Sequence, residues 1–148
     1  YFNLVCNNEI IASMTASHHH RQNASENLIV LSRLCFKDGI NVQGGSTKLF
    51  KYFKEWAKIE GFDKIISWPD NCWTEGNIYK VLGFELSKEY GPDYFYWDIK
   101  NHKYISKQSQ RKKAVNCPEG KTEREWCMER GFFRIWDAGK KLWIYNLI

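Results

Sequence analysis

The sequence predicts an α/β (α+β) domain in which strands and helices alternate around a glycine turn. A strand-like apolar run, Leu28–Phe36, is followed by the loop Asn41–Leu49 and by a run from Thr47 to about Glu60. Large apolar residues recur in that last run at three- and four-residue steps, which is the period of a helix. A second strand-like run, Lys64–Trp68, then returns the chain to the sheet. Two strands joined by such a crossover helix are expected to lie parallel.

The loop between the first strand and the helix is the main candidate for ligand binding. Gly44 and Gly45 allow positive φ and let the backbone approach a ligand closely. Ser46 or Thr47 is predicted to cap the helix. A strand–turn–helix unit aims free backbone N–H groups and the positive end of the helix dipole at an anion. A tight turn that binds no ligand is the alternative interpretation.

The loop and a second segment, Asp70–Phe84, together resemble the GNAT superfamily of acetyl-CoA-dependent N-acyltransferases. The loop signature of that family is Arg/Gln-x-x-Gly-x-Gly/Ala, and here Asn41 and Ser46 stand in its first and last places. The family also has a tyrosine four residues before a Gly-Phe pair, and Tyr79 holds this position without a gap.

The resemblance implies a mixed, mostly antiparallel sheet whose central parallel strands splay apart and hold a thioester in the gap, beyond the strand ends where α/β sheets bind ligands. The implied cofactor is acetyl-CoA or a related acyl-CoA, with its pyrophosphate on the loop amides. The implied cofactor-binding residues are Leu34, Phe36, Asn41, Gln43, Gly44, Gly45, Ser46, Thr47, Lys48 and Asn77.

The same resemblance assigns catalytic roles, each with a structural alternative. Tyr79 would give a proton to the departing CoA thiolate, or it is a core tyrosine packed on the sheet. Asp70 would orient or deprotonate the acceptor amine, or it is the N-cap of the helix that follows. Glu26 would act as general base through water, or it is a cap at the start of its strand.

The motifs are also similar to those of a bacteriophage branch of the superfamily, which includes Mom-like DNA-modification enzymes and domains attached to homing nucleases. The similarity rests on Gly44–Leu49, on Asp70, Trp73, Gly76 and Tyr79, and on the closing segment 134–143. It implies a DNA base as a possible acceptor and, for a phage-encoded protein, the host cytoplasm as its location.

Composition restricts the remaining classes of function. The chain has 148 residues and a net charge of +5, with no apolar run of membrane-spanning length and no charged-then-apolar leader. Its five cysteines are scattered, with no Cys-x-x-Cys pair, which favours a reducing cytosol and argues against a zinc ribbon. His18, His19 and His20 are interpreted as a polar loop or a substrate-facing rim, so that no metal site is expected.

The predicted organisation is an acyltransferase domain over residues 1–100, lacking the opening strand and helices usual in the family, and an extension over 101–148 that packs on it. Hairpins are predicted around Asn7-Asn8, around Gly91-Pro92-Asp93 and around Ala138-Gly139. Thr122 to Arg130 is predicted as a helix that opens with a capping box.

A basic stretch joins the two parts, and it suggests contacts with phosphate groups. A solvated linker is the alternative. The candidate nucleic-acid-binding residues are Arg21, Lys107, Arg111, Lys112 and Lys113. Two functions follow: a phage-type N-acyltransferase acting on an amine, or a non-catalytic GNAT-like DNA- or protein-binding module associated with a phage nuclease.

Overall fold

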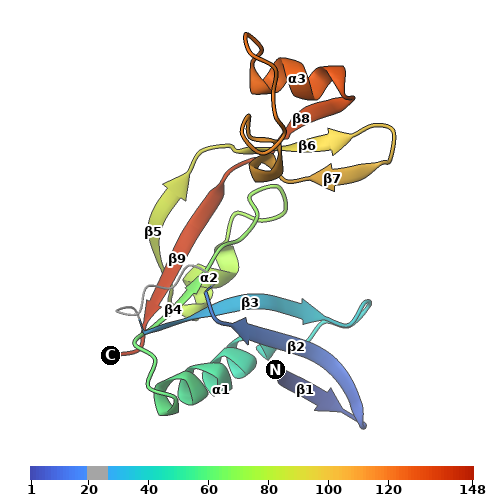
Figure 1. Ribbon diagram of the computed structural model, residues 1–148. Coiled ribbons are helices and arrows are strands. Elements are labelled where there is room, and N and C mark those ends of the chain that lie inside the picture. The colour runs from blue at the N-terminus through green and yellow to red at the C-terminus, as the bar shows by residue number, and fades with distance from the viewer. Residues whose placement is uncertain (20–26) are drawn as a thin grey trace. The chain divides into compact units, whose positions relative to one another are not determined.

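The computed structural model describes residues 1–19 and 27–148, which form two compact units (Figure 1). The first unit combines Tyr1–Tyr90 with Lys140–Ile148, and the second, Gly91–Gly139, is inserted between two strands of the first. This division differs from the predicted one at residue 100, because the last strand of the chain belongs to the sheet of the first unit.

The first unit is built on a six-stranded sheet in the order β1-β2-β3-β4-β9-β5. Of its strand pairs only β3–β4 is parallel, so the sheet is mostly antiparallel with a parallel pair at its centre, as predicted. The strands are β1 (Phe2–Cys6), β2 (Glu9–Ser17), β3 (Leu28–Phe36), β4 (Lys64–Ser67), β5 (Glu85–Tyr90) and β9 (Lys140–Asn146).

The hairpin of β1 and β2 is formed as the sequence predicts. Cys6 pairs with Glu9, and Asn7 and Asn8 have φ values of 50° and 63°. Asparagine tolerates this left-handed conformation, which gives a two-residue turn the twist that two antiparallel strands need.

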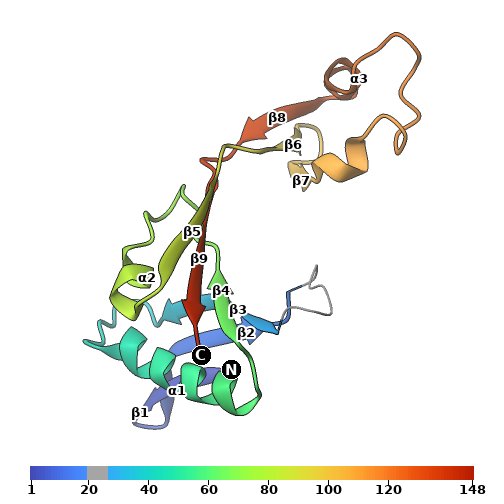
Figure 2. The same cartoon turned by 90° about the vertical axis from the view of Figure 1, so that its left-hand side faces the viewer.

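Helix α1 (Gly45–Ile59) covers one face of the sheet, as Figures 1 and 2 show, and α2 (Asn77–Leu82) follows β4. Leu49, Phe53 and Ala57 lie at i, i+4 and i+8 of α1, and all three are buried against strands β1 to β3 and their neighbours. The apolar period of the sequence therefore identified the buried side of the helix.

The second unit contains a three-stranded antiparallel sheet in the order β7-β6-β8. The Thr122 hydroxyl accepts from the Glu125 amide at the start of α3, and the Thr122 amide donates to the Glu125 carboxylate, which completes the predicted capping box. The elements are β6 (Tyr94–Asp98), β7 (Lys103–Ile105), the 3₁₀ helix η1 (Lys107–Gln110), α3 (Glu123–Glu129) and β8 (Phe132–Trp136).

The two later hairpins predicted from turn residues are wrong. β5 pairs with β9 and not with β6, and β8 pairs with β6 and not with β9. The supposed turns are instead the two connections between the units, and they bond to each other: the Asp93 amide donates to Asp137 Oδ1 at 2.8 Å, and the Asp137 amide donates to the Asp93 carbonyl at 2.8 Å. The predicted strands are present, but β5 and β6 each pair with a strand far along the chain, β9 and β8 respectively.

Over the described residues, no helix is both long enough and apolar enough to cross a lipid bilayer.

Two neighbouring aromatics on α1 provide a test of this packing. Phe53 is fully buried, whereas Tyr52 is 53% exposed. We expect Phe53→Ala to lower the free energy of unfolding by about 3–5 kcal/mol, because it leaves a cavity in the core. Tyr52→Ala is expected to change it by less than about 0.5 kcal/mol. Urea denaturation of the two variants measures both values, and equal losses would contradict the assigned buried side of α1.

Candidate active site

The parallel strands β3 and β4 are paired at their beginnings and then separate. Three residues of each strand are in register, Leu28–Val30 with Lys64–Ile66. β4 then ends at Ser67, whereas β3 continues to Phe36 while remaining paired with β2 on its other side. Figure 1 shows the two strands side by side at first and apart at their ends. The predicted splay of the central strands is therefore present.

A β-bulge lies where β3 leaves β4. Thr15 of β2 pairs with Arg33 and the next residue, Ala16, pairs with Leu31, so that Ser32 is the additional residue of β3. The Ser32 hydroxyl lies 2.6 Å from that of Ser17. A bulge bends its strand and increases the local twist, which turns the second half of β3 away from β4.

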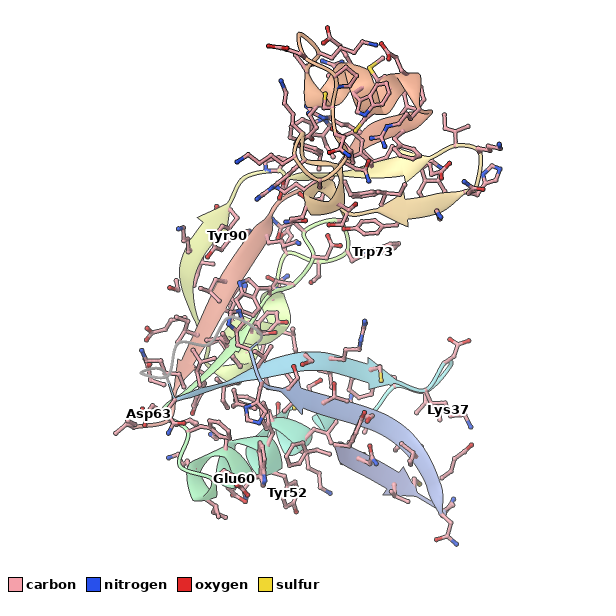
Figure 3. The ribbon with its side chains drawn as sticks, viewed as in Figure 1. Lys37, Tyr52, Glu60, Asp63, Trp73 and Tyr90 are labelled. Atoms are coloured by element: carbon pink, nitrogen blue, oxygen red, sulfur yellow. The ribbon has the colours of Figure 1, made fainter. Side chains whose placement is uncertain are left out.

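The separation of the strands leaves a cavity of about 420 Å³. Its walls come from the second half of β3, from the loop that follows β4 and from α2. The lining residues are Leu31, Ser32, Arg33, Leu34, Cys35, Trp68, Pro69, Asp70, Trp73, Thr74, Ile78, Tyr79 and Leu82. Figure 3 shows Trp73 on the loop between β4 and α2, where 87% of its surface is exposed. A cavity of this size can take a ligand of metabolite size.

Tyr79 of α2 contributes its hydroxyl where β3 and β4 part. The buried Ser67 hydroxyl donates to the Leu31 carbonyl at 2.7 Å, and Ser67 Oγ lies 2.8 Å from the Tyr79 hydroxyl. Since Ser67 has a single hydroxyl proton, and gives it to Leu31, Tyr79 must be the donor to Ser67.

The Tyr79 ring is held on two sides. It stacks on Trp143 of β9, with ring centroids 5.7 Å apart, and it meets Phe84 edge-on at 5.3 Å. Burial raises the pKa of Tyr79 above its usual 10.0. The phenol is therefore protonated at neutral pH, as a proton donor must be. Tyr79 is thus packed on the sheet and also lines the cavity. The interpretation as a core tyrosine and the interpretation as a proton donor are therefore compatible.

Asp70 also lines the cavity, and it organises the loop after β4. Its Oδ1 accepts a hydrogen bond of 2.9 Å from the Cys72 amide, and its carbonyl accepts from the amides of Trp73 and Thr74. The alternative that Asp70 caps the next helix is wrong, because α2 begins at Asn77 and its N-cap is Gly76. Asp70 is exposed, and its carboxylate borders the cavity.

The glycine loop forms the predicted strand–turn–helix unit, but with a different cap. The N-cap of α1 is Gly44, at φ 69°, and no side chain caps the helix, so the predicted cap by Ser46 or Thr47 is wrong. Gly45 is buried, and a Cβ atom there would lie 2.9 Å from Cε1 of Phe36. Positive φ at Gly44 and close packing at Gly45 explain why two glycines stand together.

Three amides at this turn are open to a ligand. The Gly45 amide donates to the Val42 carbonyl at 3.0 Å, and the Lys48 amide makes the first bond of the helix, to Gly44. Between them, the N–H groups of Gly44, Ser46 and Thr47 have no protein acceptor among residues 1–19 and 27–148. This group of donors at a helix start suits an anion such as a diphosphate.

The structure brings some of the predicted cofactor-binding residues together and leaves others apart. Leu34 lines the cavity, whereas the loop residues Asn41–Lys48 do not. Phe36 connects the two places, since its ring contacts Gly45 and its strand forms the cavity wall. Asn77 is exposed at the start of α2 and is not among the cavity-lining residues.

The predicted nucleic-acid-binding residues lie elsewhere in the chain. Lys107 begins η1 and forms an ion pair with Asp93, and Arg111, Lys112 and Lys113 follow η1 as exposed side chains. Arg21 lies outside the described residues, as do Glu26 and His20.

The other two histidines of the polar loop make ring contacts. His18 lies 6.0 Å from Phe62 and His19 5.2 Å from Trp68, measured between ring centroids. In the part of the chain that the structure describes, no three His, Cys, Asp or Glu side chains come close enough together to hold a metal ion.

Sequence reasoning missed two residues that position Tyr79. Ser67 is the only polar residue in the run Ile65–Trp68, and this isolated position inside a buried strand is a signal that could have identified it. Trp143 carries no such signal, because its role depends on β9 returning beside β4.

Comparisons with known proteins place this geometry among solved folds. No protein-family profile matches the chain, and no curated protein matches it in sequence. A GNAT family acetyltransferase from Elizabethkingia anophelis, solved with acetyl-CoA bound, has a similar structure, with a TM-score of 0.54 at 15% identity. That match covers 96% of this chain and 72% of the other.

Two further solved structures are similar over smaller parts of their own length. N-acetylglutamate synthase from Neisseria gonorrhoeae, in complex with coenzyme A and N-acetyl-glutamate, gives a TM-score of 0.54 at 8% identity, over 99% of this chain and 25% of that one. A tandem GNAT protein from the clavulanic acid biosynthesis pathway gives 0.51 at 10% identity, over 67% and 32%. The chain thus spans about a quarter and about a third of these two proteins. At such identities the likeness establishes the fold, which is GNAT-like.

The link between Ser67 and Tyr79 can be tested by titration. Because Tyr79 donates its proton to Ser67, this bond stabilises the protonated phenol, and we expect Ser67→Ala to lower the pKa of Tyr79. Tyrosine labelled with ¹³C at Cζ reports each phenol by NMR, and Tyr79→Phe identifies the signal of Tyr79. An unchanged or higher midpoint in Ser67→Ala would contradict the bond.

Proposed function

We propose that this protein is an acyl-CoA-dependent N-acyltransferase, which moves an acyl group from a thioester to an amine. The observation that carries the proposal is the cavity between β3 and β4, into which Tyr79 presents a protonated phenol. The GNAT-like fold supports it, because the similar structures include proteins solved with acetyl-CoA and with coenzyme A.

The residues present fit an acyl-CoA donor at two places. The open amides of Gly44, Ser46 and Thr47 would hold its diphosphate at the start of α1. The unpaired side of β3 beyond Leu31, with Leu34, would border its acyl end. The donor supplies an activated acyl group on sulfur, and the protein positions it.

Within the cavity, Tyr79 would donate a proton and Asp70 would orient the amine or accept a proton from it. Tyr79 holds a proton that can neutralise a sulfur anion as it leaves, which is worth about 10²–10⁴-fold in rate. Asp70, on the loop after β4, can orient an amine or accept its proton. Two titratable groups that line one cavity would supply the acid and the base that acyl transfer requires.

For the acceptor we propose an amine, with the exocyclic amine of a DNA base as the candidate that the Mom-like motifs suggest. Those motifs also support the bacteriophage branch, and both finer assignments rest on them alone. A base in a duplex would first have to be extruded, at a cost of a few kcal/mol. Mass spectrometry of nucleosides from DNA incubated with the protein and acetyl-CoA would detect the modified base.

Donor binding gives the first test. At a concentration of acetyl-CoA about 100 times its Kd, we expect the free energy of unfolding to rise by about 2.7 kcal/mol, with a higher Tm. Ser46→Pro removes one open amide in the first helical turn, where proline is tolerated, and should weaken binding by about tenfold or more. Calorimetric titration with acetyl-CoA measures the Kd.

The matched control is Ser46→Ala, which removes the hydroxyl and keeps the amide. It is expected to bind as the natural protein does. If acetyl-CoA leaves Tm unchanged, or if both variants bind as tightly as the natural protein, the amides of this loop do not hold the donor.

Catalysis gives the second test. We expect Tyr79→Phe to lower kcat by about 10²–10⁴-fold while Kd for acetyl-CoA changes little. The pKa of Tyr79 is raised above 10.0, so the group stays protonated and active at lower pH and is lost only above that value. Release of free CoA, followed with a thiol reagent, measures the rate. An unchanged kcat in Tyr79→Phe would contradict the assignment of Tyr79 as the proton donor.

A further inference from the structure

The cavity between β3 and β4 contains one cation as well as one anion. Of the residues that line it, only Arg33 and Asp70 carry a charge at neutral pH. Arg33 is an exposed residue of β3 that follows the bulge at Ser32, where β3 is no longer paired with β4. Proton transfer by Tyr79 and Asp70 leaves Arg33 without a role in the reaction.

Arg33 has no charged partner in the part of the chain that the structure describes. None of the five salt bridges between described residues includes it, and its guanidinium donates no hydrogen bond there. Its cross-strand neighbour is Thr15, and the positions two residues away on β2, Ser13 and Ser17, are also uncharged. Its positive charge is therefore available to a ligand.

The alternation of side chains along β3 directs Arg33 away from α1. Leu34 packs against the core that α1 covers, and the Phe36 ring contacts Gly45 at the start of that helix. Arg33 precedes Leu34 in a regularly paired part of the strand, so its side chain points to the opposite face of the sheet. The open amides proposed for the donor diphosphate belong to the start of α1. Arg33 is thus placed to meet the acceptor and not that diphosphate.

The rest of the cavity wall is largely apolar and partly aromatic. Trp68 and Trp73 contribute indole rings, and leucine, isoleucine and proline side chains complete the wall. Flat or apolar bodies pack well on such rings. In a pocket of this composition a few polar groups determine how the ligand is oriented. Here those groups include one positive and one negative charge, which favours a ligand that carries both kinds of group.

A guanidinium is well suited to bind a carboxylate or a phosphate. It stays charged at every physiological pH, and its parallel N–H groups match two oxygens of such an anion. Asp70, by contrast, suits the amine that acyl transfer requires. Since both residues line one cavity of about 420 Å³, a single small molecule can reach the two charges at once.

We propose that Arg33 binds an anionic group of the acceptor in the acyl transfer proposed above, on which this assignment rests. The acceptor is then an amine that also carries a carboxylate or a phosphate. A carboxylate would come from an amino acid and a phosphate from a nucleotide, and a guanidinium binds both in the same way. The exocyclic amine of a DNA base belongs to the second kind, because each base is linked to a phosphate.

Two pairs of acceptors test the proposal, and the members of each pair differ only in the anionic group. L-tryptophan is compared with tryptamine, and dAMP with deoxyadenosine, by the release of free CoA from acetyl-CoA. In at least one pair we expect kcat/KM to be about tenfold or more higher for the anionic member, because only that member forms charge-assisted bonds to Arg33. A preference for L-tryptophan identifies a carboxylate, and a preference for dAMP identifies a phosphate.

Variants assign this preference to Arg33. Arg33→Ala should raise KM for the preferred anionic acceptor by about tenfold or more and leave the values for its analogue unchanged. Arg33→Lys keeps the charge without the paired donors and should retain part of the preference. The matched control is Lys51→Ala, which removes an exposed cation of α1 and should leave the preference unchanged. Circular dichroism and the Tm shift with acetyl-CoA check that each variant is folded.

Calorimetric titration of the four acceptors separates this assignment from the proposed function. If an anionic acceptor binds more tightly than its analogue, Arg33→Ala removes the difference and no acceptor releases CoA, anion binding by Arg33 stands and acyl transfer to these amines fails. If CoA is released but both members of each pair are used equally, acyl transfer stands and the role of Arg33 is wrong. A preference that survives Arg33→Ala, or that Lys51→Ala abolishes equally, also overturns that role, as does the absence of both binding and CoA release with all four acceptors.

Discussion

The candidate site depends on one hydroxyl group, that of Ser67. It donates its only proton to the Leu31 carbonyl and accepts from the Tyr79 phenol. The first bond joins the end of β4 to β3 next to the last backbone pair of the two strands. The second brings the phenol to the same point. Without this group the cavity would lack its fixed proton donor, and a buried carbonyl would lose its partner at a cost of about 1–3 kcal/mol.

The surroundings of Tyr79 come from distant parts of the chain. Phe84 follows α2, whereas Trp143 belongs to β9, which lies between β4 and β5 in the sheet. The burial that raises the pKa of the phenol is thus supplied by packing that forms only when the last strand joins the sheet. The surroundings of the Tyr79 phenol are therefore complete only when β9 has joined the sheet and completed the core.

Local signals in the sequence predicted local structure. The Asn7-Asn8 turn, the period of α1 and the capping box at Thr122 all follow from residues a few places apart, and each is present. The predicted splay followed from resemblance to a family and not from any pattern in the strands. Those signals could not fix strand partners, because β5 and β9 meet only after a whole unit has been inserted between them. The capping of α1 was missed for a different reason: close packing of Gly45 on Phe36 moves the start of the helix to a place that propensity alone does not favour.

The inserted unit also begins and ends at one rung of the sheet. Tyr90 and Lys140 are directly opposite each other in the β5–β9 ladder. A tight turn of a few residues would join them, so Gly91–Gly139 could be removed without interrupting a strand of the main sheet. Closing a flexible loop costs only about 0.6 kcal/mol more for each doubling of its length. A sheet of this kind with a longer, a shorter or no inserted unit is therefore expected to differ little in the free energy of loop closure.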